Sequence, residues 1–372
     1  MRVADNPELA VSLPPRVPSG GARRFLVGAL CGGVLLSGSV GAFNVLADPY
    51  GYAGSGLFAV AILSDRPIKA CLVQRLGYAP SLAILGSSRA EKVEPDYLKA
   101  RTRLRGFNAA VSSATPDDAW AFANLLHDKA SGAPQRVLWF LDIESMRARP
   151  VNPGLLSTPS LSRYLARSTV VRGAFQGALS MLSWRTAADS WKTIDATLAG
   201  GVGSLSHRSC TIRTNGVTEY APDGYRRFDF HDVAVRRGTP LVRSIGKTIA
   251  EYRAIYAGDT RFARSAERRF EQSVSTLNRW HVRPVIVLTP VHPRFARELG
   301  PLGWTRRRVE LVAYLRSLRP HLRFDLLDAS EIRSFHGRPQ DFYDGVHMKV
   351  ANVRRLLDWV VAKAHRDLTP FG

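Results

Sequence analysis

Residues 81–89 read SLAILGSSR, a short apolar run that stops at a glycine and continues into two serines and an arginine. An apolar run of this length, bounded by turn-forming residues, is typical of a buried strand, and Gly-Ser indicates a tight turn directly after it. Four more short strands are expected further along the chain, at 104–111, 136–141, 284–288 and 324–328.

Helical patterns separate these strands. Thr115 and Pro116 form a helix start, with Thr as N-cap and Pro at the first helical position, and that helix is expected to run to about residue 129. Two more helices are expected at about 304–318 and 349–367. Strands that alternate with helices predict an α/β domain with a parallel sheet covered on both faces. Residues 146–240 interrupt this rhythm, and we interpret them as a partly helical insertion that forms a lid or a substrate surface.

The N-terminal part contains a candidate membrane segment. Residues 25–47 carry no charge, whereas Arg23 and Arg24 precede them and Asp48 follows. About 20 apolar residues in a helix cross a bilayer, and the preceding arginines predict a cytoplasmic N-terminus. A signal peptide cleaved after Val45-Leu46-Ala47 is the alternative, although this apolar stretch exceeds the usual h-region. Both interpretations export everything after residue 48.

These features divide the chain into four parts. Residues 1–24 are rich in proline and are expected to be a disordered cytoplasmic tail. Residues 25–47 form the anchor, 48–79 an irregular lead-in, and 80–372 the α/β domain with its insertion.

The composition restricts the possible partners. There are 52 Lys and Arg against 31 Asp and Glu, a net charge of +21, which raises the question of anionic partners. The basic residues are spread along the chain without a nucleic-acid-binding signature, so no nucleic acid is expected. The three cysteines form no CxxC, and no metal or cofactor is expected. Cys71 and Cys210 could pair in an oxidising compartment, whereas Cys31 falls in the apolar segment.

Polar residues with catalytic potential follow three of the expected strands. Function in open parallel sheets lies beyond the carboxyl ends of the strands. Ser88 follows the first strand, and Asp344 and His347 follow the last. A serine hydroxyl needs a base to become a nucleophile, and a histidine needs a carboxylate to fix its tautomer. Asp341 is an alternative partner for that histidine, and His292, between prolines, is expected to be structural or to line the pocket.

The order of a strand with GxS, a second strand ending in an Asn turn, and a late DxxH before the last helix resembles the SGNH/GDSL hydrolase superfamily. The GSSR motif after an N-terminal anchor is similar to a membrane-anchored bacterial subgroup. The resemblance implies a three-layer, flavodoxin-like parallel sheet and a triad of Ser88, Asp344 and His347. It further implies a single-pass protein of the bacterial inner membrane with a periplasmic domain. Its expected function is that of an esterase or O-acyltransferase acting on polysaccharide esters.

The oxyanion-binding residues depart from the pattern of this superfamily. Ala110 stands where glycine is usual, although its backbone N–H could still serve, and Asn108 is a second possible donor. Asp142 replaces the usual asparagine, and an ionised carboxylate donates no hydrogen bond. Losing one such donor typically costs about 10²–10³ in rate. Arg89 could contact an anion or form a structural ion pair. The alternative function is therefore a non-catalytic domain that binds polysaccharide or assembles envelope machinery.

Overall fold

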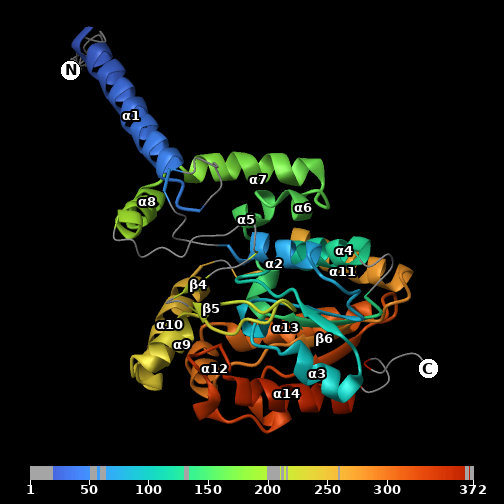
Figure 1. Cartoon of the computed structure of the whole chain (residues 1–372). Helices are drawn as coiled ribbons and strands as arrows, with labels where there is room; N and C mark the ends of the chain where they lie inside the picture. The colour runs from blue at the N-terminus through green and yellow to red at the C-terminus, as the bar shows by residue number, and fades with distance from the viewer. Residues whose placement is uncertain are drawn as a thin grey trace, which may run out of the picture.

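A five-stranded parallel sheet forms the centre of the molecule (Figure 1). Its strands lie in the order β2-β1-β3-β6-β7, and every adjacent pair is parallel. Their bounds are Leu82–Leu85 for β1, Gly106–Asn108 for β2, Arg136–Leu141 for β3, Val285–Leu288 for β6 and Asp325–Asp328 for β7. The expected α/β class and parallel sheet are confirmed. The strand at 136–141 has the expected bounds, and the other four expected strands coincide with shorter observed ones.

The computed structural model describes residues 20–50, 57–58, 64–129, 134–198, 210, 213–214, 217–258, 260–364 and 368. The predicted tail therefore lies outside the described residues, except for its last five positions, 20–24, which belong to helix α1 (Gly20–Ala47).

Both faces of the sheet are covered. Alternate residues of the central strands point to opposite sides: Trp139 and Leu141 belong to one buried apolar cluster, whereas Leu138 and Phe140 belong to the other. Helices α4 (Pro116–Lys129) and α11 (Arg264–Arg279) contribute to the first cluster, and α3 (Pro95–Thr102) and α14 (Val350–Lys363) to the second. This double cover explains why the strands read as continuous apolar runs. The remaining helices of this part are α12 (Pro293–Leu299) and α13 (Trp304–Leu318).

The lead-in was expected to be irregular, but it contains helix α2 (Asp65–Gln74). Three charged residues of α2 are buried: Asp65, Arg66 and Lys69. Arg66 Nε contacts Asp118 Oδ1 at 2.6 Å, and the ammonium group of Lys69 donates to the carbonyl of Asn108. The expectation failed because α2 has no simple apolar stripe. It buries charged side chains instead, and their ion-pair and hydrogen-bond partners lie far away in the sequence.

The insertion at 146–240 contains several helices, as expected. It contains α5 (Pro153–Leu156), α6 (Pro159–Ser162), α7 (Arg167–Ser180), α8 (Trp184–Leu198) and α9 (Phe230–Arg236), with a small antiparallel pair of β4 (Arg213–Thr214) and β5 (Val217–Thr218). Helix α10 (Leu241–Tyr256) follows it. Buried Arg226 holds the end of the insertion against the central domain, because it contacts Glu91 Oε2 at 2.6 Å, just after β1, as well as Glu219 at 3.2 Å.

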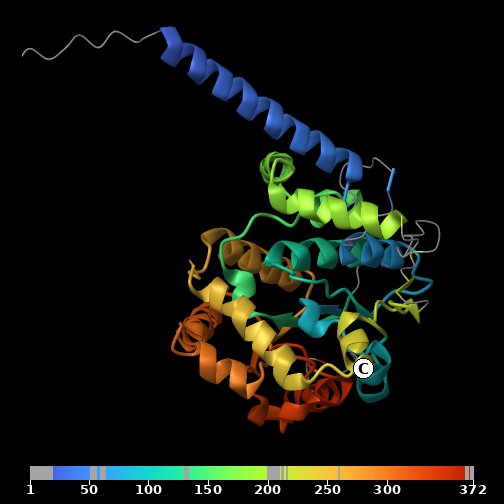
Figure 2. The ribbon, with the colours of Figure 1, turned by 90° about the vertical axis from the view of Figure 1, so that its left-hand side faces the viewer.

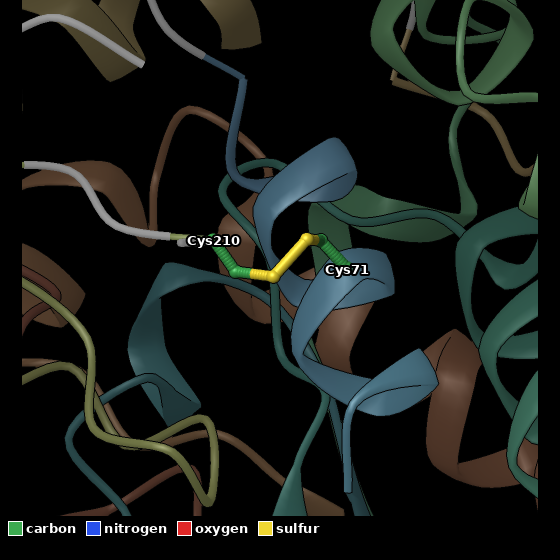
Figure 3. The surroundings of a disulfide bond; sticks show 2 residues. All are labelled: Cys71 and Cys210. Atoms are coloured by element: carbon green, nitrogen blue, oxygen red, sulfur yellow. A yellow bond between two sulfur atoms is a disulfide. The ribbon is translucent and has the colours of Figure 1, made fainter. Parts of the chain in front are cut away.

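A disulfide adds a covalent link between these two parts (Figure 3). Cys71 on α2 is bonded to Cys210 of the insertion, across a separation of 139 residues. A cross-link over so long a loop typically stabilises a fold by about 2–4 kcal/mol, chiefly by restricting the unfolded chain. The pairing that the sequence left open is therefore present in this structure.

Helix α1 projects away from the rest of the molecule (Figures 1 and 2). It is long and apolar enough to cross a membrane, and only a small part of it is buried against other residues. The helix includes the whole expected anchor at 25–47 and begins five residues earlier.

Candidate active site

The turn after β1 presents Ser88 at the carboxyl edge of the sheet. Gly86 has φ +152°, and a Cβ there would lie 2.9 Å from both the Phe140 carbonyl oxygen and Ala90 Cβ, so only glycine fits. The Ser87 hydroxyl then accepts a hydrogen bond from Arg89 N, and a single 3-10 turn begins at Ser88. Ser88 is half-buried, which leaves its hydroxyl accessible from the cleft.

His347 and Asp344 complete a chain of hydrogen bonds with Ser88. Ser88 Oγ lies 2.9 Å from His347 Nε2, and His347 Nδ1 lies 2.8 Å from Asp344 Oδ2. The other carboxylate oxygen, Oδ1, accepts hydrogen bonds from the backbone N–H groups of Val346 and His347, both at 2.8 Å. The turn at 344–347 therefore fixes the carboxylate, the carboxylate orients the imidazole, and the imidazole meets the serine. These separations match the geometry of a nucleophile with its general base.

Asp341, the alternative partner in the sequence, points elsewhere. Its Oδ2 accepts a hydrogen bond from Arg355 Nη1 at 2.6 Å on the adjacent helix α14. Asp344 is thus the acid that contacts His347 in this structure.

A second histidine reaches the same carboxylate. His231, from the first turn of α9, places Nε2 3.2 Å from Asp344 Oδ2 and Nδ1 3.3 Å from Asp229 Oδ1. Burial disfavours the charged imidazole, but hydrogen bonds to the two carboxylates outweigh it and raise the pKa of His231 to about 9. Burial also opposes the charge of Asp344, yet His347 and His231 hold the pKa of Asp344 well below its usual range. Sequence reasoning did not identify His231 as a site residue, because nothing along the chain links it to residues 344–347.

His231, Asp344 and His347 could also offer one ligand atom each to a divalent metal, because those atoms lie within 4.8 Å of one another. Their N···O separations of 2.8 and 3.2 Å are hydrogen-bond distances. Each imidazole can donate to the shared carboxylate without an ion. The hydrogen-bonded arrangement accounts for all three side chains, so we base the chemistry on it.

The charge on His231 predicts a pH-dependent contribution to stability. Its pKa is raised from 6.5 to about 9 on folding, so the contribution is complete below about pH 6.5 and disappears as the pH rises through about 9. By linkage it amounts to up to about 3 kcal/mol. Relative to His231→Gln, which keeps an amide donor without a charge, the wild type is therefore expected to lose its advantage between these pH values.

The measurement is the unfolding free energy of both proteins from pH 5 to pH 10, with and without EDTA. A difference that stays constant from pH 6.5 to pH 9 would show that His231 is uncharged in the folded protein. An advantage removed by EDTA would instead identify a bound metal.

Arg89 belongs to a buried ion-pair network. It donates to Glu144 Oε2 at 3.0 Å, Tyr252 Oη at 2.9 Å and Thr289 Oγ1 at 3.0 Å. Thr289 in turn donates to Asp142 Oδ1 at 2.8 Å. Of the two roles that the sequence left open for Arg89, these contacts correspond to the structural one. The network ties the ends of β1, β3 and β6 together behind Ser88.

The proposed oxyanion donors Asn108 and Ala110 are occupied elsewhere. The Asn108 amide is buried and donates to the carbonyls of Ala90 and Val93 at 2.9 and 2.8 Å. The backbone N–H of Ala110 donates to Asn108 Oδ1 at 3.0 Å. These two residues therefore brace the turn after β1, and the expectation that they bind an oxyanion is not supported by their contacts.

His292 also has a structural position. Its Nδ1 accepts a hydrogen bond from Arg294 N at 3.1 Å and so caps the start of α12. Its ring meets the Phe342 ring edge-on, with 5.4 Å between centroids. Of the two roles that the sequence left open for it, the capping contact supports the structural one.

A cleft of about 780 Å³ opens above Ser88 and His347. Asp142 and Ser113 lie in its wall, and Ser113 has φ +53°, a rare conformation for a residue with a side chain. Arg147 and Arg149 also line it, and burial together with the neighbouring Arg147 lowers the pKa of Arg149. Sequence reasoning missed Ser113, Arg147 and Arg149, because their positions depend on the loops between elements. A volume of this size is typical of a small-molecule binding site.

The comparisons with known proteins add no assignment. No protein-family model matches the sequence, and no curated protein matches it significantly. The functional argument therefore depends on the chemistry of the cleft: a half-buried serine, a hydrogen-bonded imidazole and a fixed carboxylate.

Proposed function

We propose that this protein is a membrane-anchored serine esterase or O-acyltransferase that acts on acyl esters of envelope or extracellular polysaccharides. One observation carries the proposal: Ser88 Oγ, His347 Nε2, His347 Nδ1 and Asp344 Oδ2 form a continuous chain with separations of 2.9 and 2.8 Å. Ser88 comes from the turn after β1, and Asp344 and His347 come from the segment before α14.

The reaction would proceed in two halves. Ser88 Oγ attacks the acyl carbonyl and its proton passes to His347 Nε2, while Asp344 stabilises the imidazolium. The bond to the sugar oxygen breaks, and that oxygen takes the proton from His347 as the alcohol leaves. A hydroxyl of water or of an acceptor sugar then gives its proton to His347 and attacks the acyl carbon. The bond from that carbon to Ser88 Oγ breaks, and Ser88 Oγ takes the proton from His347, which restores both residues. Water as acceptor gives an esterase, and a sugar gives a transferase.

The environment of Asp142 shapes this proposal. Because its carboxylate accepts a hydrogen bond from Thr289, Asp142 offers no donor to an oxyanion. Donors among the side chains that line the cleft include Ser113 and Arg149. A positively charged donor would suit a tetrahedral oxyanion, which carries a full negative charge in the intermediate.

The fold supports membership of the SGNH/GDSL-like group as a proposal. The five strands of the main sheet, numbered along the chain, have the order 2-1-3-4-5, which is the flavodoxin-like order. Ser88 follows the first strand of this sheet and the Asp344–His347 pair precedes the last helix, as the resemblance implies.

An exported location is consistent with two features. Helix α1 has the length and composition of a membrane span, and disulfides such as Cys71–Cys210 persist in oxidising compartments. We therefore propose a single-pass protein of the bacterial inner membrane with its α/β domain in the periplasm.

Labelling with a fluorophosphonate serine probe tests the proposed function. The folded wild type is expected to form a covalent adduct that depends on pH as a histidine-activated serine does, and Ser88→Ala is expected to form none. Ser317→Ala is the matched control, because Ser317 is exposed on α13 and does not line the cleft. Absence of label on the folded wild type would overturn the proposal and favour the second candidate, a polysaccharide-binding domain without catalysis, which Asp142 in place of a donor supports.

A further inference from the structure

Helices α7 and α8 of the insertion lie at the end of α1, between that helix and the α/β domain (Figures 1 and 2). Asn44 connects α1 to α8 and to the loop before it, because its side chain donates to the Met181 carbonyl at 2.6 Å and accepts from Ser190 Oγ at 2.8 Å. Tyr50, just after α1, donates to Asp189 Oδ2 at 2.7 Å. The end of the candidate membrane span is thus fixed to the loop between α7 and α8 and to α8 itself.

The uncharged part of α1 that no other described residue covers is shorter than a bilayer core. Residues 21–39 are exposed, whereas Val40, Gly41, Asn44 and Ala47 are buried. Because Arg23 and Arg24 carry charges, the uncovered uncharged part runs from 25 to 39, and its fifteen residues at about 1.5 Å each rise about 22 Å. The hydrocarbon core of a bilayer is about 30 Å thick, so a membrane crossed by the uncharged stretch 25–47 would extend past Val40, to the level where α8 packs.

The surface of α8 is reversed relative to an ordinary amphipathic helix. Its buried side is polar, with Thr186, Ser190 and Thr193 facing inward. Its exposed stripe is apolar and repeats every seven residues: Trp184, Trp191 and Leu198 are 69%, 67% and 80% exposed. Water does not favour this arrangement, whereas a membrane interface does, because Trp concentrates there.

Helix α7 and the turn after it present a second apolar stripe. Val171, Phe175 and Leu179 recur at intervals of four residues and are all exposed, and Leu182 follows in the turn. Large apolar side chains gathered on one helix face are unusual on a monomer's free surface and indicate a binding surface.

We propose that α7 and α8 lie flat in the membrane interface, with the apolar stripes of Val171, Phe175, Leu179 and Leu182 and of Trp184, Trp191 and Leu198 inserted among lipid acyl chains. The lipid bilayer is the occupant because α1 brings it to this level and α8 is hydrogen-bonded to α1. Arg185 and Lys192, each adjacent to one of the Trp residues and exposed, are placed to contact lipid phosphates. This inference does not depend on whether Ser88 is catalytic.

Such an arrangement would fix the cleft relative to the membrane. Gly173 and Gly177 of α7 border a hollow of about 480 Å³ whose lining also includes Ser113, Arg147 and Arg149. The same three residues line the cleft above Ser88. The cleft therefore continues toward the underside of α7, and a substrate held at the membrane surface would reach Ser88 by this route.

The test uses the full chain in nanodiscs that hold one copy each. In a Cys31→Ser background with the Cys71–Cys210 disulfide intact, single thiols are introduced by Phe175→Cys and Trp191→Cys and labelled with NBD. Val309→Cys is the matched control, because Val309 is an exposed apolar residue on α13, in the α/β domain. NBD at 175 and 191 is expected to shift its emission to the blue and to be quenched severalfold more by doxyl-labelled lipid than by aqueous iodide. NBD at 309 is expected to show the reverse.

Equal responses at all three sites would overturn the proposal. The same labels are also compared in nanodiscs that hold several copies. Protection at 175 and 191 that appears only there would also overturn the proposal, because a second copy would then cover the stripes. Because the three substituted side chains are exposed, the variants are expected to fold, and far-UV circular dichroism verifies this.

Discussion

Replacing Ser88 with alanine is expected to reduce hydrolysis of p-nitrophenyl acetate to the rate of the buffer and surface groups alone. In serine hydrolases the loss of the nucleophile lowers kcat by up to about 10⁶. The same loss is expected for any polysaccharide ester that the protein accepts, because both half-reactions pass through the Ser88 acyl ester.

The fold is expected to tolerate this change. Ser88 is half-buried, and its hydroxyl contacts His347, so alanine removes one hydrogen bond worth about 1 kcal/mol or less. Activity of Ser88→Ala and Ser317→Ala is compared at equal concentrations after thermal unfolding has shown that both are folded. A Ser88→Ala protein that retains more than a tenth of the wild-type rate would mean that another group attacks the ester.

The sheet could be predicted from the sequence because its strands are buried on both faces. Runs such as 136–141 are apolar without interruption, which only a doubly covered strand tolerates. The proximity of Ser88 to His347 followed from one rule, that the carboxyl ends of parallel strands share an edge. The spacing of Asp344 and His347 on a single turn supplied the carboxylate. These inferences needed only short stretches of chain and the order in which they occur.

What the sequence did not reveal depends on pairs that lie far apart along it. From the sequence, Lys69 is expected at the surface, but in the structure its ammonium group is buried and donates to the carbonyl of Asn108. From the sequence, His231 is a histidine at the start of a helix with no evident role. In the structure its Nε2 lies 3.2 Å from Asp344 Oδ2, although the two residues are 113 positions apart. Asn108 looked like a candidate oxyanion donor, yet its amide donates to the carbonyls of Ala90 and Val93 in the segment after β1. Ion pairs and hydrogen bonds leave no periodic trace, so apolar patterning cannot place them.

The insertion shows the same limit at a larger scale. The partly helical segment at 146–240 was expected to form a lid or a substrate surface, and it does contribute His231 to the site. Its helix α8, however, buries threonine and serine and exposes tryptophan. Hydrophobicity alone would have put the tryptophans inside, and only the contact of Asn44 with Met181 and Ser190 shows which side faces α1.

Replacing Asp344 with asparagine is expected to lower kcat for p-nitrophenyl acetate by about 10⁴, as loss of the carboxylate does in serine proteases. The reason lies in the two oxygens of Asp344. Oδ1 accepts from two backbone N–H groups, so the asparagine oxygen takes that place and its amide nitrogen occupies the place of Oδ2. The NH₂ group then donates to His347 Nδ1, which forces the ring proton onto Nε2. An imidazole in that tautomer cannot accept the proton of Ser88.

Asp341→Asn is the matched control. It makes the same chemical change three positions earlier, in an aspartate whose side chain does not contact His347. Its carboxylate contacts Arg355, so we expect less than a threefold change in rate. The substitution also changes the contact with His231. The NH₂ group of the asparagine faces His231 Nε2, where the wild type has the carboxylate oxygen that accepts a hydrogen bond from that nitrogen. We therefore expect the rate of Asp344→Asn to lie below that of the wild type at every pH from 6 to 9. If the carboxylate of Asp341 oriented His347 instead, Asp341→Asn would be the slower of the two variants. That ranking decides which acid orients His347, because each variant differs from the wild type by a single carboxylate-to-amide change.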